Sequence, residues 1–466
     1  MIKVSILGLG ASGIAAARLA LFHGGDVHVS DLRTETALDA AGAELRKLGA
    51  RVDLGTHDVD LIAGADVVVV SPGIPPDAPV LRALRERGIR WISEPEFAVR
   101  FYTGSLIAVT GTNGKTTTAA LTAHLLAEGG VSVGLGGNIG GGLGPAASEL
   151  ALLNPQPDWV VLEVSSFQLA DIDTFQPDIG VLTNLAPDHQ DRYPDVETYW
   201  GDKARLFRNA VPTSRWVLNR DQPEVAELAG DAPGERYWFS MEAPEFRGAR
   251  LEEGWLTLEL GDGPQPLVAP LEMALLGTHN VANALAASVT AALAGASLEG
   301  IRGGLKSFRP LPHRLGPVGT RDGVLWVNDS KATNVAAARS AVLSLIPHLD
   351  DPSSSFVPGG MEGRLVLLLG GMDKREALDD LAAVLPGRVR AVVCYGAVGP
   401  RFGDELDGVV PVIRSTGSFD EAVAAGAAAA REGDILLLAP ATSSYDQFRN
   451  YGERGDRFRM LAEGGA

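Results

Sequence analysis

The segment Thr110–Thr118, Thr-Gly-Thr-Asn-Gly-Lys-Thr-Thr-Thr, constrains the fold of this chain more than any other feature. It follows the apolar run Ser105–Thr110, which predicts a strand, and it opens a helical pattern through Leu121 and Leu125. A strand, a glycine turn and a helix in this order are typical of a phosphate-binding loop, because backbone N–H groups and the helix dipole both favour an anion at the helix N-terminus. A glycine turn that merely caps a helix is the alternative, and the order of glycine, lysine and hydroxyl favours the phosphate loop over it.

The residues of this loop suit a nucleoside triphosphate with Mg²⁺. Lys115 supplies a cation for phosphate oxygens, and the hydroxyl of Thr116 is suited to ligate Mg²⁺. The residue five before Gly114 is Val109, where the common pattern has glycine, so the sequence predicts an ATP site of a less usual kind. The loop residues predicted to bind ATP are Gly111, Thr112, Asn113, Gly114, Lys115, Thr116 and Thr117.

Short apolar runs alternate with helical patterns along the chain, which predicts an α/β fold of three domains with parallel sheets. We expect a Rossmann-like N-terminal domain over 1–103, a central P-loop ATPase-like domain over 104–308 and a Rossmann-like C-terminal domain over 309–466. Alternation around Gly254 predicts antiparallel hairpins within 237–276. The predicted strands are Val4–Leu7, Val27–Asp31, Val67–Ser71, Arg90–Ile92, Leu106–Thr110, Trp159–Glu163, Ile179–Asn184, Trp216–Asn219, Leu325–Val327, Leu365–Leu369, Ala391–Cys394 and Ile435–Ala439.

Two irregular segments frame the third domain. The prolines of Phe308–Gly316 exclude a continuous helix and suit a hinge, about which we expect this domain to swing and close over ATP. Asp350–Gly363 is rich in serine, proline and glycine and predicts a loop insertion.

Charge and composition exclude several classes of protein. The net charge of −18, from 40 basic and 58 acidic residues, argues against nucleic acid or an anionic membrane as the main partner. The single cysteine, Cys394, lies in a predicted buried strand, and no intrachain disulfide is expected. The first residues lack the layout of a signal peptide, and a buried helix explains the uncharged stretch Val281–Leu298 better than a membrane span does. We therefore expect a cytoplasmic protein.

The N-terminal domain carries a second glycine loop, Gly8–Gly13, after its first strand, with Asp31 at the end of the next strand. This pattern fits a dinucleotide-binding fingerprint, in which the acid contacts a ribose hydroxyl. A turn that binds nothing and a site for the diphosphate of another nucleotide are the alternatives, since such a loop can cradle any diphosphate. Ser71–Ile74 follows another strand end and would border the same crevice.

Two candidate metal ligands follow strands of the central domain. Glu163 ends a predicted buried strand and His189 comes just after the next one. Neighbouring strand ends of this kind suit Mg²⁺, which takes its remaining ligands from phosphate and water. A plain loop histidine is the alternative for His189 alone, and the helical spacing around Lys203 predicts only a solvated lysine. Histidines without such a context are expected to be structural or on the surface, namely His23, His28, His57, His124 and His348.

Three polar turns follow strands of the C-terminal domain: Asn328–Asn334, Gly370–Lys374 and Ala439–Phe448. Each alone fits a helix cap. Because the carboxyl ends of parallel strands meet at one edge of a sheet, three such turns predict a binding face.

Eight short motifs span all three predicted domains. They are Gly111–Thr117, Gly137–Gly140, Leu162–Leu169, Asp188–Tyr193, Gly277–Asn280, His313–Arg314, Asp329–Asn334 and Ser443–Phe448. In this order they resemble the Mur ligases of peptidoglycan synthesis over nearly the whole chain. The loop Gly8–Gly13 favours the members that add L-alanine or D-glutamate, and Asn113 favours the D-glutamate-adding member. The Asp-Asn-Pro-Arg motif of the diaminopimelate-adding member is absent.

The resemblance implies an ATP-dependent ligase that joins D-glutamate to UDP-N-acetylmuramoyl-L-alanine. ATP would phosphorylate the free carboxylate of the UDP substrate to an acyl phosphate. The amine of D-glutamate would then attack, and the tetrahedral intermediate would expel phosphate. The resemblance also implies two Mg²⁺ ions and carbamylation of Lys203, whose new carboxylate would support Mg²⁺. We expect the protein to be a monomer.

The resemblance further implies roles for individual residues. Lys115, Glu163, His189 and Lys203 would be catalytic, and the metal ligands would be Thr116, Glu163, His189 and Lys203. Beyond the loop, ATP would contact Asn280, Arg314 and Asp329. The UDP substrate would contact Gly10, Ala11, Ser12, Asp31, Ser71, Pro72, Gly73 and Asn138. D-glutamate would contact Lys331, Thr333, Lys374, Ser444 and Tyr451.

The chain departs from this family pattern at a few positions. Leu32 stands where a threonine contacts uracil, and Asp373 is shifted by one residue within its glycine turn. Tyr445 and Tyr451 stand where leucine and phenylalanine are common. The rival interpretations are a dehydrogenase that uses Gly8–Gly13, a non-catalytic nucleotide-binding protein, and a sister ligase or folylpolyglutamate synthase-like enzyme with another substrate.

Overall fold

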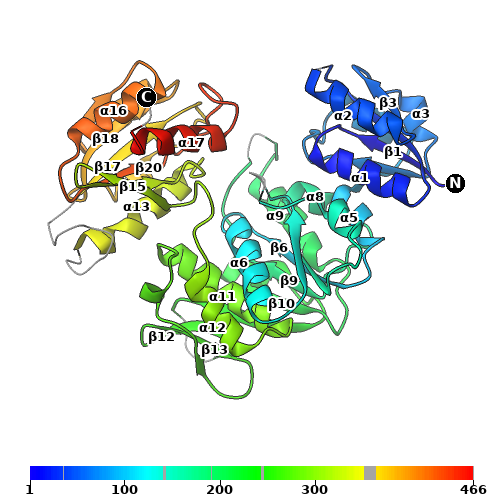
Figure 1. Cartoon of the computed structure of the whole chain (residues 1–466), viewed down its shortest axis with the longest axis horizontal. Coiled ribbons are helices and arrows are strands. Elements are labelled where there is room, and N and C mark those ends of the chain that lie inside the picture. The colour runs from blue at the N-terminus through cyan, green and yellow to red at the C-terminus, as the bar shows by residue number, and fades with distance from the viewer. Residues whose placement is uncertain (35, 140–142, 190–191, 243–245, 351–363, 465–466) are drawn as a thin grey trace. The chain divides into compact units, whose positions relative to one another are not determined.

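The computed structural model describes residues 1–34, 36–139, 143–189, 192–242, 246–350 and 364–464 (Figure 1). The chain forms two compact units, one of Met1–Glu272 with Ala282–Ser307 and one of Met273–Val281 with Phe308–Ala466. Of the predicted loop insertion Asp350–Gly363, Asp350 instead ends a helix and the remainder lies outside the described residues. Gly140, Gln190 and Asp191 of the motifs also lie outside them.

The first sheet has five parallel strands in the order β3-β2-β1-β4-β5, which confirms the predicted Rossmann-like arrangement. Its strands are β1 (Lys3–Leu7), β2 (Asp26–Asp31), β3 (Arg51–Leu54), β4 (Val67–Val70) and β5 (Ile92–Ser93). Its helices are α1 (Ala11–Phe22), α2 (Thr36–Lys47), α3 (Val59–Ala63), α4 (Pro79–Glu86) and α5 (Glu94–Val99). The strand order reverses between β1 and β4, and the crevice beyond such a reversal is where α/β sheets bind ligands. The predicted strand Arg90–Ile92 is corrected to β5, because only Ile92 and Ser93 pair with β4.

The second sheet has nine strands in the order β14-β13-β12-β11-β10-β9-β6-β8-β7. They are β6 (Ser105–Thr110), β7 (Val133–Gly137), β8 (Trp159–Glu163), β9 (Ile179–Leu182), β10 (Arg215–Asn219), β11 (Glu235–Ser240), β12 (Gly248–Glu252), β13 (Trp255–Glu259) and β14 (Gln265–Pro266). The predicted hairpin around Gly254 is confirmed by the antiparallel pair β12–β13. The hairpin prediction is wrong for β11, which pairs in parallel with both β10 and β12, because alternating burial does not reveal the direction of a strand.

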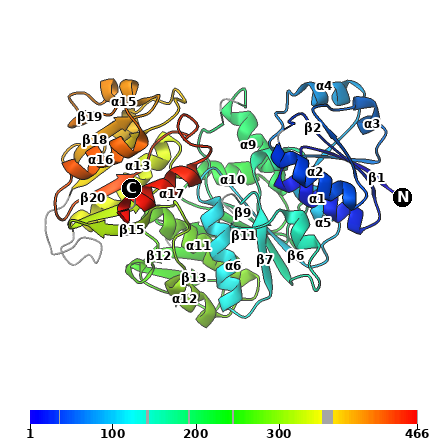
Figure 2. The ribbon, with the colours of Figure 1, turned by 45° about the horizontal axis from the view of Figure 1, so that its top comes forward.

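Helices of the first unit that follow the second sheet's strands are α6 (Lys115–Glu128), α7 (Ala147–Ala151), α8 (Ser166–Ala170), α9 (Val196–Ala204), α10 (Pro223–Ala229) and α12 (Leu298–Ser307). Helix α12 packs against α6 (Figure 2). Helix α11 (Thr278–Leu293) passes from the second unit into the first and buries Ala284–Ala287 and Val289, as predicted for the uncharged stretch. Among the described residues no helix is long and apolar enough to span a membrane.

The third sheet belongs to the second unit and has six strands in the order β15-β16-β20-β17-β18-β19. The strands are β15 (Gly316–Arg321), β16 (Val324–Asn328), β17 (Leu365–Gly370), β18 (Val389–Tyr395), β19 (Val412–Arg414) and β20 (Ile435–Leu438). All pairs are parallel except β15–β16. The helices are α13 (Val335–Asp350), α14 (Asp379–Ala382), α15 (Gly399–Glu405), α16 (Phe419–Ala429) and α17 (Tyr451–Ala462).

Both faces of the third sheet are covered, as a parallel sheet requires. Leu367 and Leu369 belong to a buried cluster with Val342 of α13, whereas Leu368 belongs to another with Phe419 of α16. The continuous apolar run of β17 thus follows from burial on two sides.

Candidate functional site

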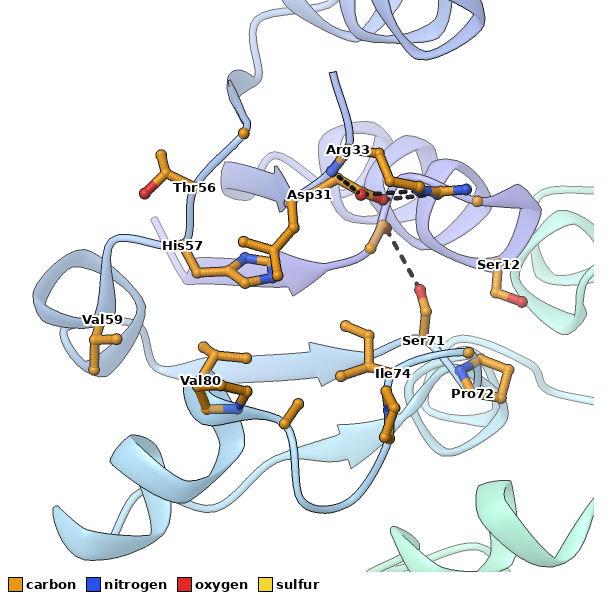
Figure 3. A pocket seen from close by; sticks show the side chains of 18 of the residues that line it. Ser12, Asp31, Arg33, Thr56, His57, Val59, Ser71, Pro72, Ile74 and Val80 are labelled. Atoms are coloured by element: carbon orange, nitrogen blue, oxygen red, sulfur yellow. Dashed lines mark hydrogen bonds and ion pairs between the residues drawn. The ribbon is translucent and has the colours of Figure 1, made fainter. Parts of the chain in front are cut away.

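A cavity of about 840 Å³ lies at the carboxyl edge of the first sheet (Figure 3). Its walls come from the loop between β1 and α1, the end of β2, the loop after β3 and the turn after β4. Gly8 has a φ of 97°, a left-handed conformation that favours glycine and lets the chain turn sharply into α1. The structure brings together here the predicted residues Gly10, Ala11, Ser12, Asp31, Ser71, Pro72 and Gly73. This volume suits a ligand of nucleotide size.

Asp31 and Arg33 form a tight pair on the cavity wall. Asp31 Oδ2 accepts hydrogen bonds from Leu9 N and Arg33 Nη2, both at 2.8 Å. Asp31 Oδ1 accepts from Arg33 N at 2.9 Å and Arg33 Nε at 3.0 Å. Burial of the carboxyl opposes its ionisation, but these bonds outweigh burial and lower the pKa of Asp31 to about 2. The carboxylate is therefore ionised at neutral pH.

The phosphate loop of the second sheet lies between β6 and α6, as predicted. Gly111 and Gly114 have φ angles of 141° and 81°, so the two glycines turn the backbone around the helix N-terminus. Asn184 Oδ1 accepts from Asn113 N at 2.9 Å, and Asn184 Nδ2 donates to Asn113 O at 2.9 Å, which clamps the loop to the segment after β9.

Two lysines meet at one carbonyl of this loop. Gly111 O accepts from Lys115 Nζ at 3.0 Å and from Lys203 Nζ at 2.7 Å. Lys203 is 1% exposed, and its amine lies 4.4 Å from the centre of the Tyr199 ring one helical turn earlier. Burial, with repulsion from Lys115 next, lowers the pKa of Lys203 well below its usual value. The prediction of a solvated lysine from helical spacing is thus wrong, because α9 turns this position inward.

Glu163 and His189 lie around the same loop. Glu163, at the end of β8 beside β6, is 4% exposed, and its Oε2 has no hydrogen-bond partner among the described residues. His189 has a φ of 55°, and its ring centre lies 5.8 Å from that of Tyr199. Asn138, predicted on the substrate side, is exposed and donates its N–H to Glu163 O at 2.8 Å.

These residues fit ATP and Mg²⁺. A buried carboxylate oxygen without a partner is costly unless a cation or donor satisfies it, and Mg²⁺ prefers such oxygens. No group of three or more His, Cys, Asp or Glu side chains suited to a metal occurs in the part of the chain that the structure describes. A site of few protein ligands matches the way Mg²⁺ is held against nucleotide phosphates.

The turns after the strands of the third sheet also converge. Lys331 Nζ lies 4.3 Å from the centre of the Tyr451 ring, and Lys374 Nζ donates to Thr333 O at 2.9 Å. Ser444, in the turn after β20, is 2% exposed. The structure therefore gathers two cations and several polar groups of the second unit at one edge of its sheet.

The remaining predicted ATP residues also belong to the second unit. Asp329 Oδ1 accepts from Leu315 N at 3.1 Å, and burial raises the pKa of Asp329 to about 7. Asn280 is 6% exposed and donates from Nδ2 to Leu276 O at 2.7 Å. Arg314 is adjacent in sequence to Leu315. Its positive charge lowers the pKa of Asp329, but burial raises that pKa by more.

Sequence reasoning missed four residues at or beside these sites. His57, expected to be structural or on the surface, lines the cavity of the first sheet, and Arg33 binds Asp31 there. Arg454 is fully buried and donates to Ser330 O at 2.9 Å and Thr442 O at 3.1 Å, joining the turns after β16 and β20. The shifted Asp373 forms an ion pair with Arg401 at 2.7 Å. Only the nearness of Arg33 to Asp31 in sequence offered a signal.

Three family models match the chain in order: "Mur ligase MurD-like, N-terminal domain" over residues 2–93, "Mur ligase middle domain" over 109–291 and "Mur ligase, glutamate ligase domain" over 313–442. The UDP-N-acetylmuramoylalanine–D-glutamate ligase of Acidobacterium capsulatum is 40% identical over 470 residues, covering 100% of this chain and 97% of that protein. The ligase of the same name from Anaeromyxobacter dehalogenans is 39% identical, with 99% and 97% covered.

Solved structures share the fold at lower identity. The UDP-N-acetylmuramate-alanine ligase MurC of Thermotoga maritima has a TM-score of 0.60 at 19% identity, with 100% of both chains covered. The MurF ligase of the same organism, solved with ADP, has a TM-score of 0.61 at 15% identity, with 99% of this chain and 97% of that chain covered. The three-domain α/β fold predicted from the sequence is thus confirmed.

Proposed function

This chain belongs to the Mur ligase family, and we propose that within it the chain is the ATP-dependent ligase that joins D-glutamate to UDP-N-acetylmuramoyl-L-alanine in peptidoglycan synthesis. The observation that carries the proposal is the full-length match to relatives of that name, together with intact lysines at the phosphate loop. The predicted division into domains of 1–103, 104–308 and 309–466 is part of this proposal.

The chemistry requires a good leaving group, because a carboxylate does not form an amide with an amine in water. The carboxylate oxygen of the UDP substrate attacks the γ-phosphorus of ATP, the bond to the bridging oxygen breaks, and ADP leaves. The amine of D-glutamate then attacks the acyl carbon, loses a proton, and phosphate departs with the electron pair of the broken C–O bond. The chain positions the reactants and neutralises charge, as in other phosphoryl transfers.

At the phosphate loop, the backbone of Gly111–Thr117 and the cation of Lys115 would bind the phosphates of ATP. Mg²⁺ neutralises phosphate charge when bound, and Thr116, Glu163, His189 and Lys203 are the residues that would hold two such ions. Asn280, Arg314 and Asp329 complete the proposed ATP contacts.

Lys203 is proposed to be carbamylated. A neutral amine can attack CO₂, so that an N–C bond forms, one C=O pair moves to oxygen and a proton leaves. The lowered pKa of Lys203 favours the neutral amine that this step needs. The resulting carboxylate would place an anion suited to Mg²⁺ beside Lys115.

The two other substrates are assigned to the other clusters. The cavity of the first sheet would bind the UDP group, with Asn138 on the muramoyl side. Lys331 and Lys374, with Thr333, Ser444 and Tyr451, would bind the carboxylates of D-glutamate, because a dianion needs cations. A monomer acting in the cytoplasm remains part of the proposal.

The test is phosphate release from ATP and Mg²⁺ with UDP-N-acetylmuramoyl-L-alanine, adding D-glutamate, L-glutamate or diaminopimelate in turn. We expect phosphate release only with D-glutamate. Lys115→Ala should lower this activity at least a hundredfold, because the variant lacks the cation that contacts the phosphates. Lys306→Ala, which removes an exposed lysine paired with Glu272, is the matched control and should retain full activity. Release with another amino acid would reassign the specificity, and no release with any would refute the proposed reaction.

A further inference from the structure

The cavity of the first sheet has two chemically different ends. Figure 3 shows Ser12 and Pro72 at one end and His57, Val59 and Val80 at the other. The first end contains the glycine loop and the N-terminus of α1, which suit a diphosphate. The second end offers apolar side chains, one imidazole and the hydroxyl of Thr56, and its apolar side chains suit a flat base.

Asp31 is poorly placed to read that base. A carboxylate has about four lone-pair sites, and Asp31 already accepts four hydrogen bonds from Leu9 and Arg33. Leu32, where a threonine would offer a hydroxyl, lines the cavity with an apolar side chain. A polar contact to the base therefore has to come from another residue of this wall.

His57 offers a polar ring atom to this end of the cavity. Its Nδ1 lies 2.8 Å from the hydroxyl of Ser30, which is fully buried. Its Nε2, on the opposite edge of the ring, has no partner among the residues that the structure describes. The ring is half-buried in the wall of the cavity.

The buried hydroxyl decides which nitrogen carries the proton. Ser30 Oγ has one hydrogen and no other side-chain partner in the described part of the chain. If Nδ1–H donated to Ser30, that hydroxyl hydrogen would be buried without an acceptor, which is costly. Ser30 therefore donates to Nδ1, and the proton of the neutral ring resides on Nε2.

We infer that His57 is a specificity-determining residue that donates from Nε2–H to the O4 carbonyl of the uracil base in the UDP substrate. In uracil, C4 lies across the ring from N1, which bears the ribose, so O4 points away from the diphosphate. His57 lies at the end of the cavity away from the glycine loop (Figure 3). Cytosine has an amino group at that position. This group is itself a donor and cannot accept a hydrogen bond from His57 Nε2–H. This inference rests on the proposed function for the identity of the nucleotide.

The test is calorimetric titration of the full-length protein with UDP and with CDP, beside a ligase assay on the same preparations. The wild type should prefer UDP. His57→Ala should weaken UDP binding roughly tenfold, the loss of one hydrogen bond, and should weaken CDP binding much less. His57→Gln, whose amide can donate from a similar position, should recover part of the preference. The KM for UDP-N-acetylmuramoyl-L-alanine should rise in His57→Ala while those for ATP and D-glutamate stay unchanged.

His28→Ala is the matched control. His28 forms the same pair with Ser5, at 2.9 Å, but its Nε2 is occupied by Asp53 at 3.1 Å. Its loss should lower stability and leave the ratio of UDP to CDP affinity unchanged. The contrary outcome is that His57→Ala loses UDP and CDP affinity equally in a protein that still ligates D-glutamate. That outcome would overturn the role of His57 and leave the proposed function standing. A wild type that neither ligates nor binds UDP would overturn the proposed function as well.

Discussion

Lys203 shows how tertiary structure can reverse the environment that a helical pattern suggests. Helix α9 mixes polar residues such as Glu197 and Asp202 with aromatic ones, and nothing in their spacing marks Lys203 as buried. In the fold, the Tyr199 ring covers the amine, and Gly111 O accepts a hydrogen bond from it. A buried lysine without an ion-pair partner destabilises the fold when it is charged. The phosphate loop thus retains a buried amine whose charged form costs stability.

We expect Lys203→Met to be more stable than the wild type at pH 7 and at least a hundredfold less active. The folded state holds Lys203 with a lowered pKa, so the wild type loses stability as pH falls from the unfolded pKa of lysine toward the folded value. The stability advantage of Lys203→Met should therefore shrink as pH is raised toward about 10, the usual lysine pKa.

Thermal unfolding in bicarbonate-free buffer across that pH range measures this effect, with phosphate release as the activity readout. Lys306→Met changes an exposed lysine and is the control for loss of charge alone. A stability difference that is independent of pH would show that Lys203 is not buried as the neutral amine.

At the scale of elements, helix α5 links the first sheet to segments around the second through two buried glutamates. Glu96 Oε2 accepts from the backbone N–H groups of Asp173, Thr174 and Phe175 at 2.7–3.0 Å. Glu94 Oε1 accepts from Ser148 N at 2.5 Å, but its Oε2 has no partner among the described residues. Burial raises the pKa of Glu94 to about 7.

Glu94→Gln should remove a pH dependence from the stability of the first unit. A raised folded pKa means that the folded state binds more protons than the unfolded state between pH 4.5 and 7, so wild-type stability falls as pH rises through that window. The unfolding free energy of Glu94→Gln minus that of the wild type should therefore increase by roughly 2 kcal/mol from pH 5 to pH 8.

Urea denaturation at several pH values measures this difference. Glu86→Gln, on the exposed side of α4, is the control for loss of one carboxyl. Parallel pH profiles for the wild type and Glu94→Gln would contradict the assignment of the titrating group to Glu94.

The elements that could be predicted are those with strong apolar runs. The predicted strand Trp159–Glu163 coincides with β8, and the phosphate loop lies where its glycines and lysine place it. The strands β3 (Arg51–Leu54) and β7 (Val133–Gly137) were missed, because alternating charges or glycines give little apolar signal. The roles of Lys203 and His57 could not be predicted from residue spacing, since each depends on a partner far away in sequence, Gly111 and Ser30.

At the scale of the whole molecule, the chain is divided into units with separate cores, although it passes between them at Glu272, Val281 and Ser307. The first sheet's cavity belongs entirely to the first unit, and the third sheet to the second. Separate cores unfold as separate cooperative units when few contacts couple them. A ligand of the cavity then stabilises the unit that holds it.

UDP alone should therefore slow hydrogen exchange in the first unit and leave the second nearly unchanged. At about 100 times its Kd, a ligand that binds only the folded state adds roughly 2.7 kcal/mol to the stability of the unit that binds it. Backbone amides of β1, β2 and β4 should show the largest protection, whereas those of β17 and β20 should keep their rates. Mass spectrometry of peptides after exchange reads both units in one sample, and inorganic phosphate at equal concentration controls for binding of an anion alone. Equal slowing in β17 and β20 would show that the two units unfold as one, because stabilisation would then spread through the whole chain.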